Sequence, residues 1–325
     1  MTTLKPKLLI ARKIYDEVLT KLEKHFEVDY NLADEVFSKT ELISRLKGKV
    51  AAMTTGTERI DEDVLKECSQ LKICANIAVG YNNFDVASMT AHHVQGTNTP
   101  DVLTETTADF GFALMMATAR RLTESEHFLR KGLWNKWSLD MFTSADVHSS
   151  TLGILGMGRI GQAIAKRGAH GFGMNVIYHN RSKLDPSLEE ACRARYVSKE
   201  ELLKQSDHLV LVLPYTQEAH HTIGESELKM MKPTATLTNI ARGGIVDDSA
   251  LIKALKTGVI AAAGLDVFEN EPKFNNEFLG LSNVVLTPHI ASASTKTRTA
   301  MAHLAADNLI AYFERGQVLN PINKV

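Results

Sequence analysis

The sequence predicts an α/β protein built from two doubly wound parallel-sheet domains. The chain has 325 residues, and at roughly 150 residues per domain it can form two domains, each with its own core. Short apolar segments alternate with amphipathic ones along most of the chain, as in parallel sheets that carry helices on both faces. A glycine-rich loop near the middle follows one apolar segment directly and begins a second series of alternating segments.

The first hundred residues contain four predicted strands and three predicted helices. The strands are expected at residues 7–11, 28–30, 50–54 and 72–78, and the helices at 14–25, 39–47 and 61–68. After Pro100, one long helix is predicted over residues 104–122. Its segment 110–116 is apolar almost all round and must be covered on more than one side. A core between domains and a subunit interface both satisfy this requirement.

The second series begins after an irregular stretch that contains Trp134 and Trp137. Strands are expected at residues 151–155, 175–179, 208–213, 234–239, 262–266 and 284–287. The expected helices are 159–171, one that ends at residue 205, 249–257 and 295–315, the last two followed by Gly258 and Gly316.

Composition excludes several classes of protein. The formal net charge of −1 gives no attraction to nucleic acid. No segment approaches the ~18 consecutive apolar residues of a membrane span, and no charged and apolar leader is evident. The three cysteines form no CxxC pair and the twelve histidines are dispersed, so we expect neither a disulfide framework nor a metal site. These features favour a cytoplasmic protein.

The glycine loop Gly156-Met157-Gly158-Arg159-Ile160-Gly161 has the pattern of a dinucleotide-binding site. Gly156 permits a tight turn, Gly158 lets the backbone approach a pyrophosphate, and Gly161 lets the helix pack on the strand. The N-terminus of the following helix offers free N–H groups to phosphates, and Arg159 can add a charge. The loop therefore predicts a Rossmann-like domain.

The residues after the next strand favour NADP(H) over NAD(H). An enzyme for NAD should carry Asp or Glu there to bind the ribose hydroxyls. This chain instead has Asn180, Arg181, Ser182 and Lys183. Arg181 and Lys183 would attract the 2′-phosphate of NADP, which an acid would repel. We therefore expect NADP(H) as the preferred cofactor and NAD(H) as the second choice.

Three further polar residues follow predicted strands, where ligands of doubly wound sheets bind. Arg242, a carboxylate from Asp266 or Glu271, and His289 suit the reduction of a 2-oxo acid. Arginine binds a carboxylate or a polarised carbonyl through its rigid fork, and histidine supplies a proton near neutral pH. A neighbouring carboxylate favours the imidazolium and fixes the ring.

Several motifs together resemble the D-isomer-specific 2-hydroxyacid dehydrogenase family, and within it the bacterial glyoxylate/hydroxypyruvate reductase (2-ketogluconate reductase) branch. The matching segments extend over nearly the whole chain; they are residues 79–85, 102–106, the glycine loop, 239–243 and 288–290. One departure is Ala291, where the family more commonly has glycine.

The resemblance implies an architecture and roles for individual residues. It implies a flavodoxin-like substrate domain of residues 1–99 and 293–325, a Rossmann-like cofactor domain of residues 100–292, and a homodimer that forms through the cofactor domains and contains the 104–122 helix. Arg242 would bind substrate and His289 would donate the proton. Glu271, which precedes Pro272, would pair with His289 in preference to its rival Glu269. Substrate would also contact backbone N–H groups of Val79 and Gly80. The implied cofactor contacts are Gly156, Gly158, Arg159, Ile160, Gly161, Asn180, Arg181, Ser182, Leu213, Pro214, Ala241, Asp266 and His289, with Asp266 meeting the nicotinamide carboxamide.

The implied activity is the NADPH-preferring reduction of small 2-oxo acids (glyoxylate, hydroxypyruvate and, as a third candidate, 2-ketogluconate) to D-2-hydroxy acids. Two other enzymes of the family fit less well, because formate dehydrogenases have Gln at the position of Glu271 and many phosphoglycerate dehydrogenases have an additional regulatory domain. The alternative from another class is an NAD(H)-sensing binding protein similar to the family's transcriptional corepressors, which also keep the three catalytic residues.

Overall fold

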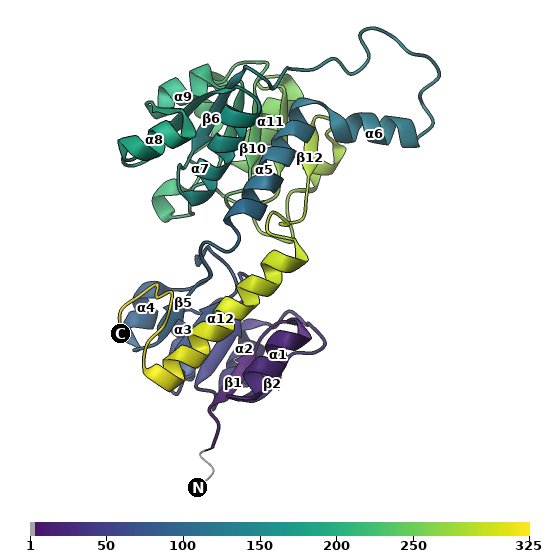
Figure 1. The fold of residues 1–325 in the computed structure, drawn as a ribbon. Coiled ribbons are helices and arrows are strands. Elements are labelled where there is room, and N and C mark those ends of the chain that lie inside the picture. Colours follow the sequence, from purple (N-terminus) through teal and green to yellow (C-terminus); the bar gives the residue numbers. More distant parts are fainter. Residues whose placement is uncertain (1–3) are drawn as a thin grey trace. The chain divides into compact units, whose positions relative to one another are not determined.

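The computed structural model describes residues 4–325, which divide into two compact units (Figure 1). The first unit comprises Met1–Leu103 and Ala293–Val325, and the second comprises Thr104–Ser292. The boundary after Leu103 thus lies a few residues beyond the predicted domain boundary, which followed residue 99. Each unit is a parallel α/β fold, as predicted.

The first unit has a five-stranded parallel sheet in the order β2-β1-β3-β4-β5, which is the flavodoxin-like order. Its strands are β1 (Lys7–Ile10), β2 (Glu27–Tyr30), β3 (Ala51–Thr54), β4 (Ile73–Asn76) and β5 (Gln95–Thr97). All residues of β3 and β4 are buried, as expected for central strands that are covered on both faces.

Two groups of helices cover this sheet. Helices α1 (Asp16–Glu23) and α12 (Thr295–Arg315) supply one core, in which Ala302, Ala305, Ala306 and Leu309 of α12 pack with Val18 and Leu22 of α1. The other core contains residues of α2 (Lys39–Leu46), α3 (Glu62–Glu67) and α4 (Val86–Ala91). The last helix of the chain is therefore part of the N-terminal unit.

The second unit has a seven-stranded parallel sheet in the order β12-β11-β10-β9-β6-β7-β8. Its strands are β6 (Thr151–Leu155), β7 (Asn175–His179), β8 (Ala194–Tyr196), β9 (His208–Leu211), β10 (Thr236–Asn239), β11 (Ala262–Leu265) and β12 (Val284–Leu286). The strand order reverses between β6 and β9, and this reversal is where doubly wound sheets bind ligands. The glycine loop follows β6 and therefore lies at this point.

Helices also cover both faces of this second sheet. Residues of α9 (Lys199–Gln205), α10 (Glu225–Met230) and α11 (Asp248–Thr257) belong to one core. Residues of α5 (Thr104–Ala119), α7 (Arg159–Lys166) and α8 (Pro186–Cys192) belong to the other. Helix α5 contacts α7 and four strands, yet Ala113 is exposed and Phe110 and Met116 are only half-buried. Within residues 4–325, no helix is both long and apolar enough to cross a membrane.

One predicted helix is interrupted, and another changes its helical form in its last turn. The prediction of one helix over residues 104–122 is wrong, because α5 ends at Ala119 and α6 (Leu122–Arg130) begins after a break. Arg121 occupies the left-handed region at φ 51° and is held there by an ion pair with Glu124 of 2.7 Å and by contact with the Phe142 ring. Helix α7 ends at Lys166 and continues as a π-helical turn, Arg167–Gly171.

Candidate active site

The predicted cofactor and catalytic residues of the second unit all follow the carboxyl ends of its strands. Because the strands are parallel and adjacent, these ends share one edge of the sheet. From β7 to β12 this edge carries Arg181 after β7, the glycine loop after β6, Leu213 after β9, Arg242 after β10, Asp266 after β11 and His289 after β12.

The glycine loop has a shape that fits a dinucleotide. Gly156 has φ 99°, and a Cβ at this residue would lie 2.7 Å from the backbone nitrogen of Leu213. A Cβ at Gly161 would lie 2.4 Å from the carbonyl oxygen of Gly156, so the loop can close onto α7 only with glycine there. A Cβ at Gly158, by contrast, would meet nothing within 4 Å. The backbone is thus open at the residue where a pyrophosphate would approach the helix N-terminus.

The loop after β7 presents Arg181 and Ser182 to solvent. Lys183 lies 3.3 Å from Glu189, so its charge is already shared with a carboxylate. Glu218 lies near Arg181: its pKa is lowered by hydrogen bonds from its own amide and Thr216, and further by the charge of Arg181. Both cations predicted to attract a 2′-phosphate thus have an acidic neighbour. Lys183 is in a direct ion pair with Glu189, whereas Arg181 acts on Glu218 only through its charge, so Arg181 is the better placed of the two.

His289 and Glu271 form a direct pair. The Nδ1 atom of His289 lies 2.8 Å from Oε2 of Glu271, and the other oxygen of Glu271 accepts a hydrogen bond of 2.7 Å from the amide of Phe268. His289 has φ 53°, in the left-handed region, which costs conformational energy in a non-glycine residue. Because Nδ1 of His289 is bonded to Glu271, Nε2 is the ring nitrogen that can bond to a reacting group.

Glu269, the rival partner, has a different neighbour. Its carboxylate bonds with Nε2 of His221, and its amide donates to Asp248 at 3.2 Å. The partner of His289 is therefore Glu271, which precedes Pro272.

Arg242 is held at the end of β10 by its own turn. The side chain of Asn239 accepts from the amide of Ala241 at 3.0 Å and donates to the carbonyl of Arg242 at 3.3 Å. The guanidinium donates to the carbonyl of Ala241 at 2.7 Å. Burial lowers the pKa of Arg242 below its usual value, and the charge of Glu271 partly offsets this. Arg242 and Glu271 thus act on each other electrostatically.

Asp266 anchors the loop that carries His289. The carboxylate is fully buried and accepts hydrogen bonds from the amides of Ile290 and Ala291, at 2.8 and 2.9 Å, and from the hydroxyl of Thr287 at 2.8 Å. Burial raises the pKa of Asp266, and these hydrogen bonds oppose the rise. The predicted contact of Asp266 with a nicotinamide carboxamide stays a prediction, and the structure adds this anchoring role.

The predicted substrate-binding backbone of the first unit follows β4. The carbonyls of Ala78, Val79 and Gly80 accept hydrogen bonds from the Thr99 amide at 2.9 Å, the Asn98 side chain at 2.8 Å and the Asn76 side chain at 3.1 Å. In a trans peptide the N–H points opposite to the C=O. The three bonds therefore fix the directions of the N–H groups of Val79, Gly80 and Tyr81.

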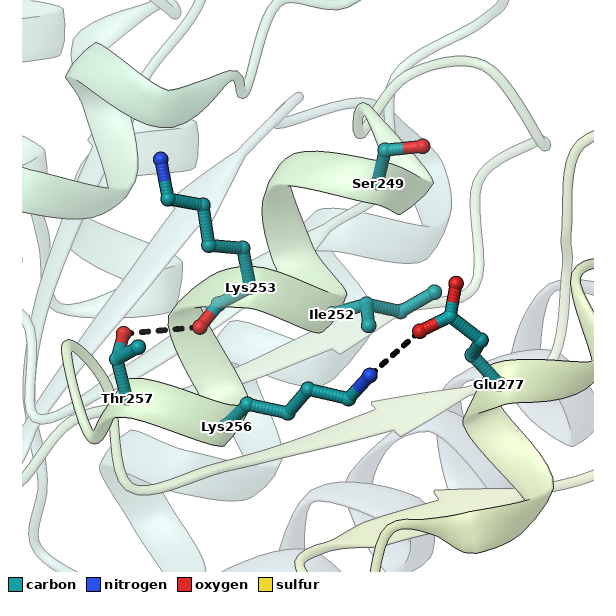
Figure 2. Close-up of a pocket in the computed structure, with 6 residues that line it drawn as sticks. All are labelled: Ser249, Ile252, Lys253, Lys256, Thr257 and Glu277. Carbon is teal, nitrogen blue, oxygen red and sulfur yellow. Dashed lines mark hydrogen bonds and ion pairs between the residues drawn. The ribbon is translucent and has the colours of Figure 1, made fainter.

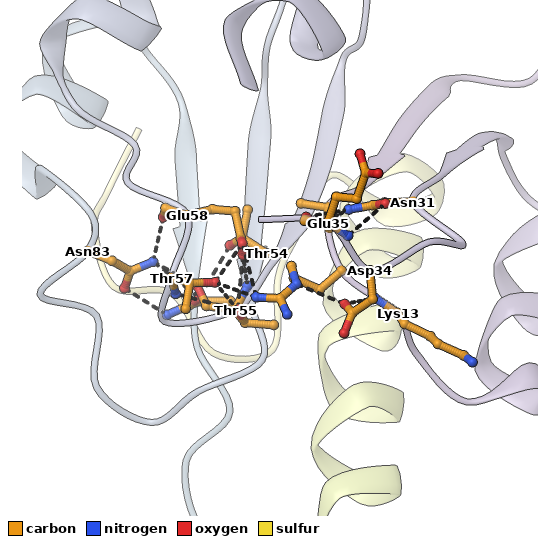
Figure 3. Close-up of polar contacts among 12 residues, drawn as sticks. Lys13, Asn31, Asp34, Glu35, Thr54, Thr55, Thr57, Glu58 and Asn83 are labelled. Atoms are coloured by element: carbon orange, nitrogen blue, oxygen red, sulfur yellow. Dashed lines mark hydrogen bonds and ion pairs between the residues drawn. The ribbon is translucent and has the colours of Figure 1, made fainter. Parts of the chain in front are cut away.

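A polar network fixes the loop after β3 at the same sheet edge (Figure 3). Glu58 is buried and accepts from the amide of Thr55 at 2.7 Å and from the hydroxyl of Thr57 at 2.6 Å. Asn83 donates to the carbonyls of Thr55 and Glu58 at 3.0 and 2.9 Å. Residues 55–58 are thus held in one conformation beside the backbone that is predicted to bind substrate.

A surface hollow on α11 lies apart from these residues (Figure 2). Its lining includes Lys253 and Lys256, but Lys253 pairs with Glu225 and Lys256 with Glu277. Both charges are thus partly neutralised, and the hollow has little attraction for an anion.

Sequence reasoning missed several residues that shape the site. Asn239 and Thr287 stood inside the motifs, but the motif pattern did not reveal their bonds to the Arg242 turn and to Asp266. No sequence motif points to Asn76 or Asn98. Each side chain donates a hydrogen bond to a backbone carbonyl that only the fold brings near. The pair of His221 with Glu269 joins residues that are 48 positions apart.

Comparison with known proteins agrees with this geometry. Residues 112–291 match the family model described as D-isomer specific 2-hydroxyacid dehydrogenase, NAD binding domain. The chain is 49% identical over 319 residues to a glyoxylate reductase of Thermococcus gammatolerans, which covers 97% of this chain and 95% of the relative. A glyoxylate reductase of Pyrococcus horikoshii is 47% identical, with the same coverage.

Solved structures show the same fold. A D-isomer specific 2-hydroxyacid dehydrogenase from Polaromonas has a TM-score of 0.90 at 34% identity, covering 98% of this chain and 100% of that chain. An NADPH-dependent glyoxylate/hydroxypyruvate reductase from Sinorhizobium meliloti, in complex with NADP and malonate, has a TM-score of 0.85 at 33% identity, covering 98% and 97%. The chain is therefore an NAD(P)-dependent oxidoreductase and belongs to the D-isomer-specific 2-hydroxyacid dehydrogenase family.

Proposed function

We propose that this chain reduces small 2-oxo acids to D-2-hydroxy acids and prefers NADPH. Glyoxylate and hydroxypyruvate are the first candidates and 2-ketogluconate the third. The observation that carries the proposal is the pair of His289 with Glu271 at 2.8 Å, with Arg242 within electrostatic reach of Glu271. The names of the relatives, glyoxylate reductase and glyoxylate/hydroxypyruvate reductase, support the choice of substrates.

Each predicted site residue has its own role in the proposed reduction. The dinucleotide, held by the glycine loop, supplies the hydride when it is bound. Arg242 binds the carboxylate and polarises the carbonyl of the 2-oxo acid. His289 gives a proton from Nε2 to the carbonyl oxygen, and Glu271 holds the ring through Nδ1. The N–H groups of Val79 and Gly80 bind the substrate carboxylate.

The preference for NADPH is supported by the loop after β7. No carboxylate stands at residues 179–184, and Arg181 is exposed there. Hydrogen bonds to a charged group contribute about 1.5–3 kcal/mol each, so one such bond changes affinity by roughly ten- to a hundredfold at ~1.4 kcal/mol per decade. A single arginine is thus enough to set a preference.

The first prediction concerns the proton donor. His289→Gln should lower kcat by about 10²–10⁴, because general acid catalysis contributes a factor of this size. The dissociation constant of the dinucleotide should stay unchanged. Steady-state kinetics and fluorescence titration measure the two quantities. His148→Gln, an exposed histidine of the same unit beside Asp146, is the matched control. A normal kcat in the His289→Gln variant would show that His289 is not the proton donor.

The second prediction concerns the cofactor. Arg181→Ala should raise the KM for NADPH by at least about tenfold, through the loss of one charged hydrogen bond, and should leave the KM for NADH unchanged. Arg195→Ala, which removes an exposed arginine paired with Glu201, should change neither constant. An equal rise of the KM values for NADPH and NADH in Arg181→Ala would show that Arg181 does not bind the 2′-phosphate.

The third prediction concerns the substrate-binding backbone. Asn98→Ala removes the bond that orients the Gly80 N–H and should raise the KM for the 2-oxo acid several-fold. The KM for NADPH should not change, because the glycine loop is in the other unit. The matched control is Asn275→Ala, which removes a side chain that accepts a bond from the amide of Glu277. An unchanged KM for the 2-oxo acid in the Asn98 variant would argue against carboxylate binding by this backbone.

The fourth prediction concerns assembly. We propose a homodimer through the cofactor domains, supported by the incompletely buried Phe110, Ala113 and Met116 on α5. Ala113→Arg places a charge in that face and should produce a monomer by light scattering, whereas Ala191→Arg on the exposed side of α8 should not. A wild-type monomer, or a dimer that survives Ala113→Arg, would contradict this interface.

A further inference from the structure

Two histidines and a glutamate meet in the second unit outside the predicted catalytic set. One nitrogen of the His220 ring, one of the His221 ring and one carboxylate oxygen of Glu269 all lie within 4.8 Å of one another. The two imidazoles are stacked, with ring centroids 3.8 Å apart and planes at 22°. Nε2 of His221 contacts the Glu269 carboxylate directly.

The backbone holds these side chains in place. The amide of His221 donates to the carbonyl of Gly244 at 2.7 Å, and His221 has φ 51°, in the left-handed region. Such a conformation in a non-glycine residue persists only where the surroundings impose it. On the other side, the amide of Glu269 donates to the buried Asp248 at 3.2 Å.

One histidine also has an outer partner. Nδ1 of His220 lies 3.1 Å from the hydroxyl of Tyr215, which leaves Nε2 of that ring available. A metal-binding histidine commonly bonds through its second nitrogen to a neighbouring polar group, which fixes the ring and its tautomer. Tyr215 provides such a bond.

We propose that His220, His221 and Glu269 form a binding site for a divalent transition-metal ion, with zinc as the ion that suits it best. Two imidazole nitrogens and one carboxylate oxygen are a donor set that zinc accepts at about 2.0–2.2 Å, with water as the fourth ligand. Ligands of a tetrahedral ion at that distance are about 3.4 Å apart. Binding therefore requires the two exposed rings to rotate and His221 to separate from Glu269.

The site differs from the catalytic pair and from the expectation drawn from the sequence. His289 bonds with Glu271 and not with Glu269, so zinc at His221 does not require the proton donor. The sequence predicted no metal site because the histidines were dispersed. The fold changes this by placing Glu269 beside two consecutive histidines, the nearer of which, His221, lies 48 positions earlier in the chain.

The experiment is a calorimetric titration of the full-length, metal-free protein with zinc chloride. Wild-type protein should bind one zinc ion per chain in a saturable manner, and Mg²⁺ should give no comparable signal because it prefers oxygen ligands. Glu269→Gln and His220→Gln should each weaken zinc binding by at least about tenfold. His221→Asn should do the same, with asparagine chosen because it tolerates a positive φ. Circular dichroism checks that each variant is folded.

His148→Gln is the matched control, because His148 also lies beside a carboxylate, Asp146, at 3.9 Å but in an exposed pair outside the three-residue group. Its zinc affinity should equal that of the wild type. The proposal is overturned if the wild type shows no saturable binding in excess zinc, or if folded Glu269→Gln protein binds zinc as tightly as the wild type. It is also overturned if the His148 control loses affinity to the same extent. Glu269→Gln is the decisive variant if a histidine substitution unfolds the chain, because it preserves the size of the side chain.

Discussion

The buried carboxylate of Asp266 is the interaction on which the geometry of the catalytic edge depends. Removing a charge from water costs several kcal/mol, and here three hydrogen bonds from residues 287–291 offset part of that cost. The same bonds tie the end of β11 to the loop after β12. That loop holds His289 at a positive φ, a conformation that requires such support. The Asp266 anchor on one side, and the bond from the Phe268 amide to Glu271 on the other, therefore set the distance from His289 to Glu271.

The two units contribute different kinds of groups. The second unit supplies the glycine loop and the charged side chains Arg242, Glu271 and His289. The first unit supplies oriented backbone N–H groups, whose directions are set by side-chain bonds from Asn98 and Asn76. In both units the groups follow the carboxyl ends of parallel strands. Within each unit, this placement brings residues that are far apart in sequence to one edge of the sheet.

Much of the fold and the family could be predicted, because the signals are local. Buried strands such as β3 and β4 are continuous apolar or small-residue segments, and the glycine loop and the His289 motif have fixed spacing. The break between α5 and α6 could not be predicted, since Arg121 is held in its conformation by Glu124 and by the distant Phe142. The residues alone left the choice between Glu269 and Glu271 open, because a turn of a few residues decides which carboxylate reaches His289. The family resemblance favoured Glu271, and the coordinates show this carboxylate beside His289. The group His220, His221 and Glu269 exists only in three dimensions.

The proposed activity can be tested by measuring the rates at which the wild-type protein oxidises NADPH and NADH with 2-oxo acids of increasing length. We expect turnover with glyoxylate and hydroxypyruvate, and a higher kcat/KM with NADPH than with NADH. A strong preference for NADH would contradict the role given to Arg181. Absence of turnover with every small 2-oxo acid would contradict the catalytic role of Arg242, Glu271 and His289 and favour a dinucleotide-sensing binding protein.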